Sequence, residues 1–167
     1  STGNKELIKS QPACSINSIE NFNHLPAFGN EYRLVKKQEA KQIEVNGHTF
    51  DIVDDIIFQL EYNLNLYYDL NGVGLLYFAA YPIINDFCEA NHFNSMQDNI
   101  ERWEQIYATS TRDILYYANC DANDSIIYKL NTYEEVNNNT VKLSSSLFRK
   151  SDNILMGRIF TIKKKTL

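Results

Sequence analysis

Residues 69–86, DLNGVGLLYFAAYPIIND, are the stretch that decides which fold this sequence predicts. The stretch opens on a polar, turn-forming tetrapeptide, Asp69-Leu70-Asn71-Gly72, and is then almost continuously apolar as far as Phe87. A helix that is apolar on nearly every side is expected where a sheet surrounds it. The pattern therefore predicts a long buried helix from Leu75 to Phe87. Pro82 must kink or restart this helix, because proline has no amide donor.

Segments with strand character flank the predicted helix on both sides. Before it, Asn46-Gly47 joins two β-prone runs and is the pair that a type I′ turn favours, so residues 41–53 predict a hairpin. Residues 56–62 predict a further strand, and residues 96–107 predict a shorter helix that carries Trp103. Four β-like runs separated by Asn/Asp-rich turns follow, at residues 111–117, 125–134, 141–149 and 154–163.

Early strands, one long buried helix and a four-strand antiparallel meander predict an α+β protein. The arrangement that fits is the hot-dog fold, in which a curled antiparallel sheet wraps around a long central helix. We expect one hot-dog domain over residues 31–167. Residues 1–30 are polar and lack periodicity, which predicts a linker or a loosely docked arm. Ser1-Thr2-Gly3 resembles a remnant of cloning, so we expect the chain to be a piece of a longer protein.

Composition narrows the classes of function. The chain has 167 residues and a net charge of −5, which argues against nucleic-acid binding because that requires a basic face. No apolar run approaches the roughly 20 residues of a membrane span, and no signal peptide is visible. The three cysteines, Cys14, Cys88 and Cys120, show no C-x-x-C spacing, which argues against a disulfide framework and a structural zinc site. We therefore expect a cytoplasmic protein that holds no metal.

Two stretches carry a resemblance to a known family. One is residues 69–86, and the other is residues 110–119, STRDILYYAN, supported by residues 146–152, SLFRKSD. Together they resemble the LnmK-like bifunctional acyltransferase/decarboxylase family of polyketide biosynthesis, which has two hot dogs. The resemblance is to the C-terminal half and covers roughly residues 50–165, so one hot dog stands here where the family has two.

The resemblance implies chemistry on acyl thioesters. Such enzymes decarboxylate methylmalonyl-coenzyme A and deliver propionyl to an acyl carrier protein through an acyl-tyrosine. The nucleophilic tyrosine belongs to the half that this chain does not match, so no tyrosine here inherits that role. The resemblance implies an acyl carrier protein as partner and no cofactor beyond the coenzyme A or phosphopantetheine that carries the acyl group. It also implies a homodimer, or a partner hot-dog domain, in place of the missing half.

The start of the central helix is the expected site. Gly72 and Gly74 let backbone amides approach a ligand, and free amides at a helix N-terminus can hold a thioester oxygen; a tight turn explains both glycines equally well. Asn71 is a candidate donor to a thioester carbonyl or a malonyl carboxylate, and Asp69 a candidate base. Both residue types also commonly cap helices.

Further candidates lie on the helix and the next strand. Tyr77 and Tyr81 are spaced to share a helical face, and a tyrosine hydroxyl can donate to an enolate oxygen, although most tyrosines serve packing. Thr111 and Arg112 are candidate substrate-binding residues, because Arg112 can pair with a carboxylate or a phosphate. A strand end at the surface accounts for them as well.

Two alternatives to a decarboxylase/acyltransferase stay open. One is an acyl-thioester hydrolase in which Asp69, Asp86 or Glu89 activates water. The other is a non-catalytic hot-dog domain that binds a carrier protein or dimerises.

Overall fold

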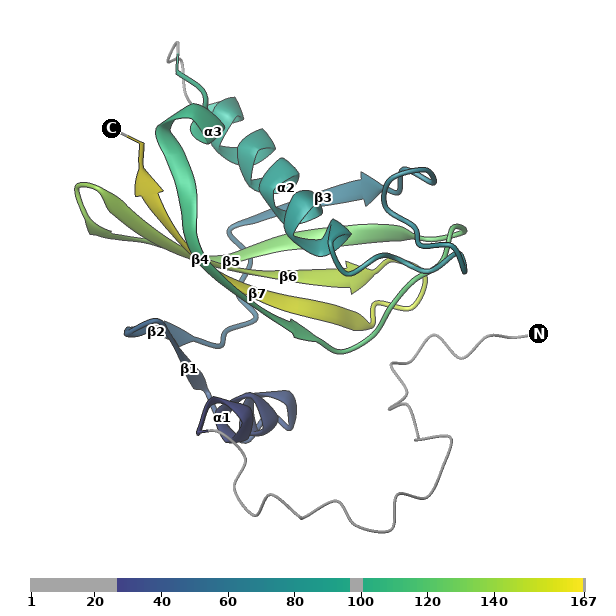
Figure 1. Cartoon of the computed structure of the whole chain (residues 1–167), viewed down its shortest axis with the longest axis horizontal. Coiled ribbons are helices and arrows are strands. Elements are labelled where there is room, and N and C mark those ends of the chain that lie inside the picture. The colour runs from purple at the N-terminus through teal and green to yellow at the C-terminus, as the bar shows by residue number, and fades with distance from the viewer. Residues whose placement is uncertain (1–26, 97–100, 167) are drawn as a thin grey trace.

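A five-stranded antiparallel sheet forms the body of the protein, as the computed structural model shows for residues 27–96 and 101–166 (Figure 1). In space the strands follow the order β3-β5-β6-β7-β4, and every neighbouring pair is antiparallel. The strands are β3 (Phe58–Asn63), β4 (Tyr107–Tyr116), β5 (Ser125–Asn137), β6 (Thr140–Arg149) and β7 (Leu155–Lys165). Residues 1–26 of the expected arm lie outside the described residues.

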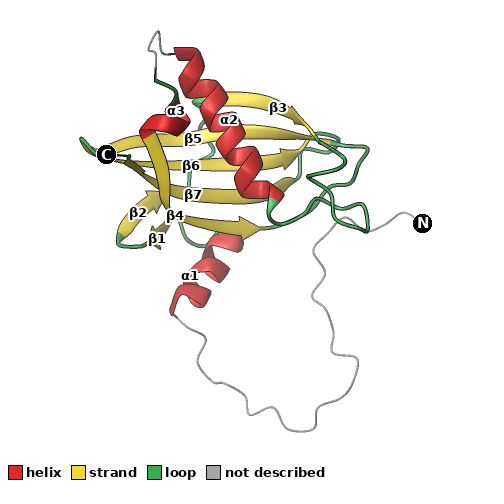
Figure 2. Ribbon diagram, turned by 45° about the horizontal axis from the view of Figure 1, so that its top comes forward, coloured by secondary structure: helices red, strands yellow, loops and turns green. Residues whose placement is uncertain are grey.

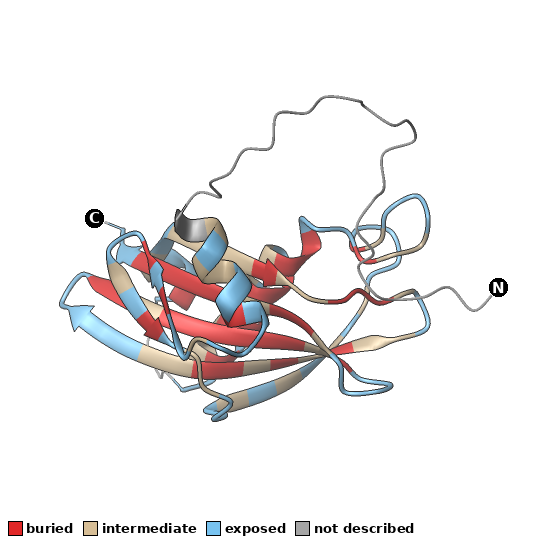
Figure 3. Ribbon diagram, turned by 90° about the horizontal axis from the view of Figure 1, so that it is seen from below, coloured by how far each residue is buried: buried red, intermediate tan, exposed pale blue. Residues whose placement is uncertain are grey.

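One long helix, α2 (Ala80–Met96), crosses one face of this sheet (Figure 2). Its buried side chains include Tyr81, Ile84 and Cys88, which pack into one cluster with strand residues such as Leu130 and Ile159. The buried positions lie along the middle of the strands, whereas the hairpin end of β5 is exposed (Figure 3). The sheet curled around one helix is the hot-dog fold, which confirms the predicted α+β class.

A smaller layer covers the opposite face of the sheet. It consists of α1 (Ala27–Lys36), β1 (Gln42–Val45) and β2 (His48–Asp51). Successive strand residues point to opposite faces, so Ile159 packs beneath α2 while its neighbour Phe160 packs with Phe50 of the smaller layer. The predicted hairpin is confirmed: Val45 pairs with His48, and Asn46 and Gly47 have φ values of 49° and 76°, as a type I′ turn requires.

The central helix begins later than the sequence indicated. Leu75 and Leu76 form isolated β-bridges, with Asp121 and Leu70 respectively, and helical backbone starts only at Ala80. Pro82 therefore lies in the first turn, where a missing amide costs no helical hydrogen bond, and no kink is needed.

The helix predicted over residues 96–107 is confirmed only in part, as one short turn that carries Trp103. α2 ends at Met96, residues 97–100 lie outside the described part, and α3 (Trp103–Ile106) is a single short turn. Tyr107 already belongs to β4, where it pairs with Lys165, so strand pairing overrides the helical pattern. Within the described ranges no helix has the length and apolar character needed to cross a membrane.

Candidate functional site

The loop that leads into α2 folds back on itself through its own polar groups. The Asn71 side-chain oxygen accepts hydrogen bonds from the amides of Val73 and Leu75, both at 3.1 Å. Gly74 has a φ of 77°, a left-handed conformation that favours glycine. The Tyr77 amide then donates to the backbone oxygen of Asp69 at 2.7 Å. This bond brings Asp69 next to the residues that open α2.

Asp69 is held by one of its two carboxylate oxygens. Its side chain is buried, and Oδ2 accepts hydrogen bonds from the Tyr62 hydroxyl at 3.0 Å and from the Asn65 amide at 2.7 Å. Burial, aided by the bond to Asp69, raises the pKa of Tyr62 to about 12, so the hydroxyl stays protonated and donates. Oδ1 accepts no hydrogen bond from any described residue and is not fully enclosed. The carboxylate is thus oriented with one oxygen available for chemistry, and it does not cap α2.

Unused backbone donors follow Tyr77, the residue whose amide binds the backbone oxygen of Asp69. Among the described residues, the amides of Phe78 and Ala79 have no backbone acceptor, and they immediately precede the first helical residue. They lie at the N-terminal end of α2, where the helix dipole favours a developing negative charge. The Gly72 amide also lacks a backbone acceptor within this part of the chain.

The two candidate tyrosines do not share a helical face. Tyr77 precedes the helix, and its side chain is about half exposed at 52%. Tyr81 is fully buried and its hydroxyl donates to the backbone oxygen of Ala118 at 2.8 Å. Tyr77 therefore stays at the surface of the loop, whereas Tyr81 ties α2 to the segment after β4.

Arg112 and Thr111 are engaged away from this loop. The Arg112 guanidinium binds both carboxylate oxygens of Asp86, at 2.9 and 2.5 Å, and its Nε donates to Thr161 at 3.1 Å. The Thr111 hydroxyl accepts a hydrogen bond from Asn46 at 3.3 Å. The structure thus brings Asp69, Asn71, Gly72, Gly74 and Tyr77 together and leaves Thr111 and Arg112 elsewhere.

A buried charge network joins α2 to the sheet. Lys163 Nζ lies 2.9 Å from Asp86 Oδ1 and 2.9 Å from Glu89 Oε2, and Glu89 is 1% exposed. Burial alone would raise the pKa of Asp86, but Arg112 and Lys163 outweigh it and lower the pKa below its ordinary value. Burial dominates at Glu89 and raises its pKa, although Lys163 opposes the shift. A doubly paired carboxylate such as Asp86 is a weak base.

The same network holds residues that the sequence analysis missed. Asn85 donates to Glu89 Oε1 at 2.6 Å and accepts from the Ser145 hydroxyl at 2.5 Å. The signal for Asn85 was its place in an otherwise apolar helix, where a polar residue needs a partner. Lys163 lacked such a signal, because three consecutive lysines are typical of an exposed tail.

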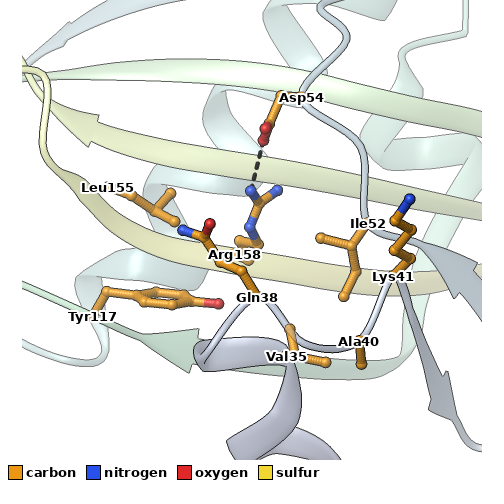
Figure 4. A pocket seen from close by; sticks show the side chains of 9 residues that line it. All are labelled: Val35, Gln38, Ala40, Lys41, Ile52, Asp54, Tyr117, Leu155 and Arg158. Carbon is orange, nitrogen blue, oxygen red and sulfur yellow. Dashed lines mark hydrogen bonds and ion pairs between the residues drawn. The ribbon is translucent and has the colours of Figure 1, made fainter.

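A small hollow on the opposite face has its arginine already paired (Figure 4). It lies between the end of α1 and β7, and its Arg158 binds Asp54 at 2.6 Å and the backbone oxygen of Val53 at 3.3 Å. The start of α2 remains the better candidate for a site.

No protein-family model and no curated protein matches the sequence. Solved structures do match. A 4-hydroxybenzoyl CoA thioesterase from a Pseudomonas species is 13% identical with a TM-score of 0.56, over 65% of this chain and 83% of that one. A thioesterase from Thermus thermophilus, complexed with coenzyme A and Zn, is 8% identical with a TM-score of 0.57, over 67% and 86% of the two chains. A putative acyl-CoA thioesterase from Xanthomonas campestris is 11% identical with a TM-score of 0.57, over 66% and 93%. Identities this low show the shared hot-dog fold.

Proposed function

We propose that this protein processes acyl thioesters, and that the reaction is hydrolysis with Asp69 as the base. The observation that carries the proposal is the half-satisfied carboxylate of Asp69 beside the unused amides that open α2. A base and a set of oxyanion donors are the two groups that water attack on a carbonyl requires. The thioesterase names of the structural neighbours support the same class of substrate.

The step divides between these groups as follows. Asp69 Oδ1 takes a proton from water while the water oxygen bonds to the thioester carbon. The carbonyl oxygen becomes negative and accepts hydrogen bonds from the amides of Phe78 and Ala79. The carbon–sulfur bond then breaks as the carbonyl re-forms, and the proton passes from Asp69 to the departing sulfur. The products are a carboxylic acid and a free thiol, and no cofactor is consumed.

The state of Arg112 favours hydrolysis over decarboxylation. A malonyl-type substrate needs a partner for its free carboxylate, and Arg112 was the charged candidate for that role beside the neutral amide of Asn71. Its guanidinium is instead occupied by Asp86 in a two-point ion pair. A simple acyl thioester makes no such demand on the site.

Decarboxylation with acyl transfer to a carrier protein is the second candidate. The Asn71 side-chain nitrogen donates to no described residue, which leaves it available to a substrate oxygen. Decarboxylation requires a polarised thioester carbonyl and no base, so removal of Asp69 would then have little effect.

The test compares two acidic residues in a free-thiol release assay with propionyl-, benzoyl-, malonyl- and methylmalonyl-coenzyme A. Asp69→Asn keeps an oxygen that can accept from Tyr62 and Asn65, so the fold should persist, as circular dichroism will report. We expect thiol release to fall at least 100-fold, the usual size of a lost general base. Asp54→Asn is the matched control, because Asp54 is 84% exposed and lies on the opposite face of the sheet.

Mass spectrometry of the products separates the candidates. Free acid that depends on Asp69 supports hydrolysis. Carbon dioxide release or a propionylated carrier protein, both insensitive to Asp69→Asn, would contradict hydrolysis and support decarboxylation with acyl transfer. A protein that releases no product from any of the four thioesters but binds a carrier protein would contradict both reactions and indicate a non-catalytic domain.

A further inference from the structure

The C-terminal end of α2 carries an aromatic cluster with a hollow of about 340 Å³ beside it. The described side chains that line the hollow are Ile57, His92, Phe93, Met96 and Tyr133. Ile57 and Met96 are 53% and 70% exposed and form its rim, while His92 is only 9% exposed. Pockets of this size and character are typical of small-molecule sites.

His92 is the polar group of this hollow that has no side-chain hydrogen bond within the described part of the chain. Its ring stacks on Phe58 at 4.4 Å between centroids and meets Phe93 edge-on at 4.8 Å. Neither ring nitrogen forms a hydrogen bond with a described residue, and both the burial and the stacking fix the ring in place. Burial lowers the pKa of His92, so the imidazole is uncharged at neutral pH and has one donor and one acceptor.

The other walls are apolar or already satisfied. Phe93 stacks against Trp103 at 4.0 Å, which holds its ring in one orientation. The Tyr133 hydroxyl donates to Glu135 at 2.9 Å. None of the described side chains that line the hollow carries a positive charge, so a carboxylate or phosphate would lose its hydration without compensation.

We propose that this hollow binds a small, uncharged aromatic molecule with a single hydroxyl group. The ring of the ligand packs on Phe93, and its hydroxyl bonds to His92. A dry apolar cavity of about 150 Å³ is enough for benzene, so the larger hollow accommodates a substituted ring. The site is separate from Asp69, because it lies at the other end of α2, about 20 Å away at 1.5 Å per residue. The site is therefore separate from the groups of the proposed reaction.

Trp103 provides the reporter for a direct test. It is the one tryptophan of the chain, so the ¹⁵N-labelled protein has one indole N–H resonance. The probes are 4-methylphenol and toluene, which have the same shape and differ in the hydroxyl. We expect 4-methylphenol to shift this resonance saturably and to bind about fivefold more tightly than toluene, the contribution of one net hydrogen bond.

Two substitutions locate the binding. Ile57→Ser removes part of the apolar rim and should weaken both probes about fivefold. Ile154→Ser, at another isoleucine that is 40% exposed and lines no part of the hollow, should leave both unchanged. His92→Phe keeps the stacking and should abolish the preference for 4-methylphenol. The absence of a saturable shift, equal affinities for the two probes, or equal effects of the two serine variants would overturn the proposal.

Discussion

Lys163 neutralises two carboxylates on the inner face of α2, and one of them, Glu89, is almost completely buried. A buried ion pair contributes little when intact, because desolvation offsets the attraction between the charges. Removal of one partner is costly, since it leaves a charge in the interior without compensation. Asp86 retains Arg112 when Lys163 is lost, whereas Glu89 has no other cation at salt-bridge distance among the described residues.

Lys163→Met should therefore destabilise the protein by about 3 kcal/mol at pH 8. Burial raises the pKa of Glu89 and Lys163 opposes this, so the variant raises it further. A carboxyl with a raised folded-state pKa contributes stability below its unfolded pKa and loses it as pH rises. The loss should thus be smaller at pH 5 than at pH 8, as urea unfolding at both values will measure. Lys164→Met is the exposed control, expected within about 0.5 kcal/mol of wild type. A pH-independent loss would contradict the assignment.

At this scale the sequence identifies residue types more reliably than their partners. Asp69 and Asn71 stood out because polar residues interrupt the chain just before an apolar run, and the structure brings both to the start of α2. The pairing of Arg112 with Asp86 depends on how α2 lies across β4, which no local pattern encodes. Strand alternation, applied beyond the first lysine, would have indicated that Lys163 and Lys164 face opposite sides.

The loop before α2 keeps its shape through two devices, the Asn71 side chain and the left-handed backbone of Gly74. Gly72 lies two residues earlier and has no positive φ, and a Cβ atom at either glycine would meet nothing within 4 Å. The two glycines therefore differ in conformational demand alone. Alanine substitution at the two positions therefore distinguishes a requirement for the left-handed conformation from a requirement for the space that glycine leaves free.

Gly74→Ala should destabilise the protein by about 1 kcal/mol, because the left-handed backbone conformation is sterically strained for any residue with a Cβ atom. Gly72→Ala should leave the free energy of unfolding within about 0.5 kcal/mol of wild type. Urea titration of both variants gives the comparison. Equal effects of the two substitutions would show that the conformation of Gly74 is not what the loop requires.

Elements with strong local signals were predicted and others were not. The Asn46-Gly47 hairpin and the four late strands follow from turn chemistry and β-prone runs, and the structure confirms them. The start of α2 was predicted too early. Leu75 and Leu76 lie in isolated β-bridges, and the apolar pattern alone does not distinguish a bridge from a helix. The helix α1 was not predicted from the sequence. Its buried side chains pack against the hairpin and the sheet, and these contacts are not visible in the local sequence pattern.

At the scale of the whole molecule, the first half of α2 and its preceding loop expose large apolar side chains. Ile83 is 62% exposed, Phe87 52% and Phe78 51%. Contiguous exposed apolar surface commonly marks an interface. This agrees with the proposal, made from the resemblance to a two-hot-dog family, that a second copy of the chain replaces the missing half.

Ile83→Glu should consequently weaken self-association, because the charge would have to be buried in the interface. We expect light scattering after size exclusion to report a dimer for the wild type and at least a tenfold higher dissociation constant for the variant. Leu34→Glu, at a 42% exposed position of α1, is the control expected to remain dimeric. A wild type that stays monomeric at every concentration measured would rule out the pairing.

The architecture as a whole was predicted from the order of elements, which admits few packings once a helix is apolar all round. The reaction could not be predicted in the same way. One fold supports many different reactions, and only the contacts at the site distinguish between them. Here the occupied guanidinium of Arg112 changes the order of the candidates, and that contact became visible only in three dimensions.

The strand order also bears on how the protein assembles during synthesis. β7 is the last described strand along the chain, but it lies inside the sheet, between β6 and β4. β4 leaves the ribosome well before β7, which is its one neighbour in the five-stranded sheet. In the same way, β3 has no strand to pair with until β5 has been synthesised. A nascent chain therefore holds an unpaired strand and an uncovered apolar helix until nearly the whole domain has emerged. We expect such a topology to fold slowly and to complete its sheet in one late event, with the unpaired segments prone to aggregation until then.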